Sequence, residues 1–117
     1  MKAMIYLSLL LNIAVLVPVT SGLLGSAGWA EDAYGPASPA RGILLSVYLA
    51  ILAASIALLF RPLPGLVASL IFVQIVYKLT TPFTVGTLQN PVVVSNLAIA
   101  AFHFVTLALI VINGELD

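Results

Sequence analysis

The fold is decided by residues 42–80, which read GILLSVYLAILAASIALLFRPLPGLVASLIFVQIVYKLT. Two continuous apolar runs lie on either side of Arg61-Pro62-Leu63-Pro64-Gly65. Each run comes close to the roughly 20 helical residues that cross a hydrocarbon core, and neither alternates in polarity as the strands of a membrane β-barrel do. Because prolines and a glycine separate the runs, we expect a tight turn there. The stretch therefore predicts an antiparallel pair of transmembrane helices.

The same pattern extends along the rest of the chain, where charged side chains separate apolar runs. The predicted spans are residues 3–24, 42–60, 64–80 and 91–113. Loop-forming glycine, proline and acidic residues fill 25–40, and Pro82 and Pro91 bracket the third connection, which disfavours a continuing helix. Residues 1–117 are therefore predicted to form one domain: an all-α, polytopic integral membrane protein folded as a compact four-transmembrane-helix bundle.

The overall composition favours lipid as the solvent. Hydrophobic residues make up 62% of the chain and charged residues 7%, against about 45–50% and 25% in soluble domains. The formal net charge is +0, so the chain lacks the excess of basic residues typical of nucleic-acid-binding proteins, and we expect no nucleic-acid partner. The absence of cysteine excludes disulfides, thiolate metal sites and cysteine nucleophiles. The bilayer itself is thus the first expected partner.

The first apolar run has a competing interpretation as a secretory signal. Lys2 precedes it and small residues at 26–30 precede Glu31, which is typical of a cleavable signal peptide. The run is longer than the usual apolar core of about 7–15 residues. We therefore expect it to be retained as a transmembrane helix.

Basic residues hardly decide the orientation of the spans. Lys2 and Arg61 fall on one side of the membrane and Arg41 and Lys78 on the other, so the positive-inside count is tied. The long acidic loop is more typical of a translocated segment. We therefore expect both termini to be cytoplasmic.

Small residues recur at helical spacing in three of the predicted spans. Close approach of helices in lipid favours such faces. They comprise Ser46, Ala50 and Ala54, then Gly65 and Ser69, and finally Ala98, Ala101, Val105 and Ala108. These faces predict helix–helix contacts within the bundle.

His103 and Asn96 are the first candidate binding residues. His103 is the single histidine and falls near the middle of the fourth span, with Asn96 two helical turns earlier on the same face. An ionisable side chain at that depth is a functional-site hypothesis. The imidazole could relay a proton, bind a ligand head group or ligate a metal centre such as haem. Alternatively, it forms a packing hydrogen bond between helices.

Gln74, Tyr77 and Lys78 are further candidates, because their spacing places them on one face of the third span. Together with Ser8 and Asn12 on the first span, they could line a polar pocket for a lipid head group, a quinone or a small anion. Tyr77 and Lys78 could instead be interfacial anchors. Arg41, near the long loop, is either solvated or organises that loop.

No catalytic constellation is present, and we predict no catalytic residues. All four acidic residues lie outside the spans, so none reaches the depth of His103 for Ser-His-Asp chemistry. The chain holds no phosphate-binding glycine loop and no zinc motif. A non-enzymatic role is favoured over an enzyme, while the identity of any cofactor or metal stays open.

Three functions remain. The first is a non-enzymatic accessory, structural or assembly subunit of a membrane complex, partnered by other membrane subunits or by itself. The second is a membrane-embedded binder of a lipophilic ligand, such as a quinone, haem or lipid, that uses His103 and Asn96. The third is a small dimeric transporter. In size and helix number the chain is similar to the small multidrug resistance transporters, but its first span holds no acidic residue.

Overall fold

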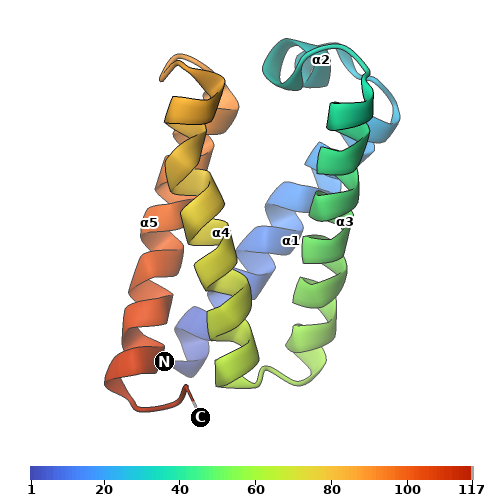
Figure 1. Cartoon of the computed structure of the whole chain (residues 1–117). Helices are drawn as coiled ribbons and strands as arrows, with labels where there is room; N and C mark the ends of the chain where they lie inside the picture. Colours follow the sequence, from blue (N-terminus) through green and yellow to red (C-terminus); the bar gives the residue numbers. More distant parts are fainter. Residues whose placement is uncertain (117) are drawn as a thin grey trace. The chain divides into compact units, whose positions relative to one another are not determined.

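The computed structural model describes residues 1–116, and these form helices without any strand. The helices are α1 (Lys2–Leu24), α2 (Gly28–Tyr34), α3 (Pro39–Phe60), α4 (Pro64–Val85) and α5 (Pro91–Ile112), shown in Figure 1. The predicted all-α fold class is confirmed. So is the prediction of four helices that are long and apolar enough to cross a membrane.

Length and composition make this a multi-pass membrane protein. The most apolar windows of α1, α3 and α5 have mean hydropathies of 2.1, 2.6 and 2.1. The value for α4 is lower, at 1.5, because this helix carries Gln74, Lys78 and several hydroxyl side chains. Buried polar side chains also lie on α1 and α5, but α4 is the least apolar of the four long helices.

The chain divides into two compact units. The first, called here the hairpin unit, joins Met1–Ser8 to the chain from Arg61 onward, and so contains α4 and α5. The second, the loop unit, is Leu9–Phe60 and contains most of α1 together with α2 and α3. That residues 1–117 act as one domain stays a prediction.

Capping residues define where α3 and α5 begin. The Ser38 hydroxyl accepts a hydrogen bond from the Arg41 amide at 3.1 Å, so α3 begins at Pro39, earlier than the predicted residue 42. The Asn90 side chain accepts from the Val92 amide at 2.8 Å. In both helices proline takes the first position, where its missing N–H costs nothing.

The helix α4 continues past the predicted end of the third span at residue 80. Pro82 was expected to stop it, because proline leaves the carbonyl four residues earlier without its amide partner. That carbonyl belongs to Lys78, and the Thr81 hydroxyl donates a hydrogen bond to it at 2.7 Å. The helix therefore runs on to Val85 and ends at Gly86, which has a φ of 84°.

A short helix also replaces part of the predicted loop at residues 25–40. In α2, Ala30 is buried and Glu31 lies in the first turn, where a carboxylate favours the helix dipole. A Cβ atom on Gly22 would collide with the Trp29 indole, so the absence of a side chain there admits the ring against α1. The sequence lacked an apolar periodicity long enough to predict this helix.

The predicted small-residue faces are only partly buried: Ala54, Gly65 and Ala108 are half-buried, and a Cβ atom on Gly65 would collide with the Leu116 carbonyl. Ser46 and Ala50 on α3 are exposed, as are Ala98 and Ala101 on α5. The buried face of α5 instead carries Val93, Asn96, Ala100, His103, Thr106 and Ile110. In lipid an apolar or small side chain loses nothing by facing outward, whereas a polar one does. Polarity therefore determines which face is turned inward.

Candidate functional site

The candidate site lies in the hairpin unit, where α4 and α5 pack side by side (Figure 1). The buried residues of α4 are Val67, Ala68, Ile71, Gln74, Ile75 and Lys78. Both helices thus bury polar side chains among apolar ones. We call these side chains the polar seam: Gln74 and Lys78 on α4, and Asn96, His103 and Thr106 on α5.

Lys78 and Asn96 form the charged end of the polar seam. The Lys78 ammonium donates to Asn96 Oδ1 at 3.4 Å, and the two side chains are only 5% and 6% exposed. The same ammonium lies 4.9 Å from the centroid of the Tyr77 ring, within range of a cation–π interaction. Both partners are neutral. A buried ammonium with neutral neighbours is costly to desolvate.

His103 and Thr106 continue the polar seam along α5. His103 is fully buried, and it follows Asn96 by two helical turns, or about 10 Å along the axis. Thr106 shares a hydrogen bond of 2.7 Å with Ser8, which α1 contributes to this unit. The seam therefore covers about half the length of α5 (Pro91–Ile112), from the Asn96 amide to the Thr106 hydroxyl.

Gln74 and Tyr77 occupy different positions. Gln74 is buried and donates to the Leu70 carbonyl of its own helix at 3.4 Å. Tyr77 is half-buried and offers its ring to Lys78. Of the five predicted residues, the structure brings Lys78, Asn96 and Tyr77 into direct interaction. Gln74 and His103 lie farther along the same buried faces.

Ser8 and Asn12, which were expected to line one polar pocket together with Gln74, Tyr77 and Lys78, bond to residues in different units. Ser8 bonds to Thr106 in the hairpin unit, whereas Asn12 donates to the Ser55 hydroxyl at 3.1 Å in the loop unit. Thr106 belongs to the polar seam although it was not among the candidate binding residues. Its signal was in the sequence, because it lies one turn beyond His103 on the stripe that Asn96 begins.

Arg41 organises the long loop, which was one of its two expected roles. This side chain is 7% exposed, and its guanidinium donates to Gly35 O at 2.9 Å and to Ser26 Oγ at 3.1 Å. A longer contact of 3.5 Å reaches Leu23 O in the last turn of α1. Arg41 thus ties the end of α1 and the end of α2 to the start of α3.

The polar seam is chemically suited to holding a group rich in hydrogen-bond acceptors. It offers an ammonium, an amide, an imidazole and a hydroxyl, all of which can donate. Within residues 1–116, no three His, Cys, Asp or Glu side chains gather in a group that could hold a metal ion. With a single histidine in the sequence, the chain can supply one imidazole to a metal centre.

Comparisons with protein-family models, with curated proteins and with solved structures find no match for this chain. The case for a function rests on the residues of the polar seam and on the surfaces of the helices.

Proposed function

We propose that the protein is a membrane-embedded binding protein whose polar seam holds the head group of a lipophilic ligand. The observation that carries the proposal is the buried Lys78 ammonium beside Asn96, in a chain whose acidic residues all lie outside the four spans. Ionisable side chains within membrane-spanning segments mark ligand, ion or proton sites. His103, buried two turns farther along α5, supplies a second group of this kind.

Energetics favour a functional role for Lys78 over a purely structural one. Replacing a buried charged group by apolar side chains of similar volume is often neutral or stabilising. A helix pair that needed only to pack would be served as well by leucine or methionine at this position. The buried lysine is thus retained at an energetic cost, which a bound ligand would offset.

Native mass spectrometry of protein gently solubilised from its own membranes tests the proposal. We expect an additional bound mass on the natural protein, lost in Lys78→Met and in His103→Ala. Ser69→Ala is the matched control, because Ser69 is exposed and bonds only within its own helix, to the Gly65 carbonyl. If folded Lys78→Met and His103→Ala both keep the same mass as the control, the proposal fails.

The exposed face of α3 supports a second candidate, an accessory or assembly subunit. Ser46, Ala50, Ala53 and Ala57 follow one another at helical spacing, and all four are exposed. Small residues of this kind let another transmembrane helix approach closely. Stable association with other subunits in the same mass spectra, abolished by Ala50→Leu, would favour this role. Extraction of the chain from the membrane without any associated subunit would count against it.

We also propose that both termini face the cytoplasm. The support is the acidic loop that contains Glu31 and Asp32, which is more typical of a translocated segment than of a cytoplasmic one. The basic residues do not contribute, since they divide equally between the two sides.

A further inference from the structure

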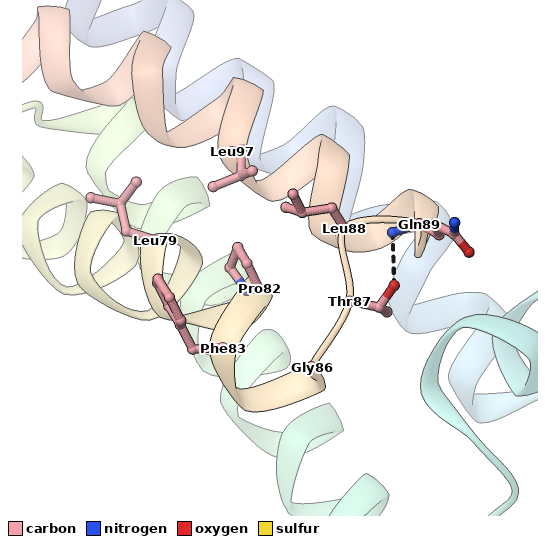
Figure 2. A pocket seen from close by; sticks show the side chains of 8 residues that line it. All are labelled: Leu79, Pro82, Phe83, Gly86, Thr87, Leu88, Gln89 and Leu97. Carbon is pink, nitrogen blue, oxygen red and sulfur yellow. Dashed lines mark hydrogen bonds between the residues drawn. The ribbon is translucent and has the colours of Figure 1, made fainter.

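A pocket lies next to the charged end of the polar seam. It has a volume of about 650 Å³ and is formed where α4 ends and α5 begins. Figure 2 shows its apolar lining residues, Leu79, Pro82, Phe83, Leu88 and Leu97. The pocket is open to its surroundings, since the Phe83 and Leu88 side chains that line it are 86% and 64% exposed. An open apolar hollow of this kind suits an acyl chain or the ring system of a lipophilic molecule lying against the helices.

The pocket and the Lys78–Asn96 pair occupy the same turns of the two helices. Leu79 directly follows Lys78, and Pro82 lies one helical turn farther on. On α5, Leu97 directly follows Asn96. One turn is about 5.4 Å along a helix axis. A ligand in the pocket therefore lies at the same height along the two helices as Lys78, whose buried side chain is not itself part of the lining and would have to turn toward it.

Within residues 1–116, the Lys78 ammonium has a long hydrogen bond to Asn96 and a contact with the Tyr77 ring. It has three N–H donors, and its bond to Asn96 Oδ1 measures 3.4 Å. Charge-assisted bonds from an ammonium to a carboxylate or phosphate are about 2.7–2.9 Å and roughly twice as strong as neutral ones. Because the existing bond is long, a turn of the flexible lysine stem toward the pocket sacrifices little. An anion there would replace a long bond to a neutral oxygen with an ion pair.

We propose that the ligand is an amphiphilic anion, whose carboxylate or phosphate pairs with Lys78 while its apolar body occupies the pocket. This inference rests on the proposed binding function and names its ligand class. Lys78 lies about 10 Å along the helix axis before the end of α4 at Val85. Polar Thr87 and Gln89 border the pocket at its loop side. There the backbone N–H of Gln89 donates to the Thr87 hydroxyl at 3.0 Å (Figure 2).

The test uses the full chain in phosphatidylcholine nanodiscs and three probes: palmitic acid, its methyl ester, and decylubiquinone as a neutral ring ligand. We expect the acid to bind at least tenfold more tightly than the ester. Lys78→Met should abolish that preference, and Lys78→Arg should keep it. Leu97→Trp, which narrows the pocket, should weaken both acid and ester, whereas Val105→Trp on the exposed face of α5 should weaken neither.

Nanodiscs doped with phosphatidylglycerol distinguish the two sources of the anion. If this lipid displaces palmitic acid, the anion is a phospholipid head group; if it does not, a free carboxylate is the ligand. Both results support the amphiphilic anion.

Two results would overturn the inference. If acid and ester bind equally, or if Lys78→Met still prefers the acid, the ligand is not an anion that pairs with Lys78. Tight binding of decylubiquinone alone, lost in His103→Ala, also removes it but leaves the proposed binding function intact. If none of the probes binds and the native protein carries no extra mass, the proposed binding function and the inferred ligand class are both wrong.

Discussion

At the scale of single residues, Lys78 and Asn96 behave as a coupled pair. Removing the amide leaves a buried ammonium without its oxygen partner, which costs at least about 1–3 kcal/mol. Removing the ammonium leaves only the neutral Asn96 amide without its donor, at the lower end of that range, whereas replacing both groups by apolar side chains is often close to neutral. We therefore expect Asn96→Leu to destabilise the protein more than Lys78→Met does. In the double variant, most of the loss should be recovered.

The free energy of unfolding in mixed detergent micelles measures this coupling. Ser69→Ala again serves as a control for polar-to-apolar changes on α4 that touch no other helix. If the two substitutions changed the free energy of unfolding additively, Lys78 and Asn96 would not be coupled. Such changes add for independent sites but not for interacting ones.

Arg41 carries the second prediction at this scale. It bonds to Gly35 O and Ser26 Oγ from a buried position, and hydrogen bonds to charged groups contribute about 1.5–3 kcal/mol. Arg41→Ala should therefore release the segment between α1 and α3. Lysine at this position should restore only part of the stability, because a point-like ammonium cannot reproduce the guanidinium fork.

Hydrogen exchange across residues 23–38 measures the release of this segment. Arg61→Ala is the matched control, since Arg61 is exposed in a turn. Exchange that is equally slow in the Arg41 and Arg61 variants would show that the loop does not depend on Arg41.

At the scale of elements, α4 shows how a helix passes a proline. The Thr81 hydroxyl occupies the Lys78 carbonyl that Pro82 leaves without an amide partner. Thr81→Val should therefore cost about 1 kcal/mol, the usual net value of one hydrogen bond. In a Pro82→Ala background the backbone amide returns to that carbonyl, and the same Thr81→Val change should cost almost nothing.

This double-mutant cycle is read from unfolding free energies, with circular dichroism reporting the helix content. Thr80→Val offers a control, because the exposed Thr80 hydroxyl bonds to the Tyr77 carbonyl. The residue four positions after Tyr77 is Thr81, not a proline, so a backbone amide is available to this carbonyl. An equal cost of Thr81→Val in both backgrounds would refute this role of the threonine.

At the scale of the whole molecule, four membrane-spanning helices require both chain ends to lie on one side. The sequence contains no cysteine, so single introduced cysteines can be labelled without background. We expect Lys2→Cys and Glu115→Cys to react with a membrane-impermeant maleimide only in inverted vesicles. Asp32→Cys and Thr87→Cys should react only in right-side-out cells.

The pattern of labelling separates two ways of being wrong. Labelling of Lys2→Cys and Glu115→Cys from opposite sides would exclude four spans. Labelling of both from outside the cell would preserve the four spans and reverse the proposed orientation.

The sequence by itself determined the four long helices, because a continuous apolar run is a local property of the chain. Long apolar runs demand lipid, and prolines with glycine at 61–65 demand a turn, whatever the rest of the chain does. The two-turn spacing of Asn96 and His103 likewise placed both on one face of α5 before any partner was known. Glu31 and its neighbours gave no comparable signal, since a helix as short as α2 depends on burial of Ala30 and on the Trp29 contact.

Only the tertiary structure decided which polar groups meet. Lys78 and Asn96 are brought together by the packing of α4 against α5, and Ser8 reaches Thr106 from the other end of the chain. The small-residue faces suggested different contacts, and most of their residues, such as Ser46, Ala50, Ala98 and Ala101, are exposed. Apolar and small side chains are almost equally at home against lipid and against protein, so their pattern leaves the choice of face open. Polar side chains cannot stay in lipid without partners, and the arrangement of the helices supplies those partners.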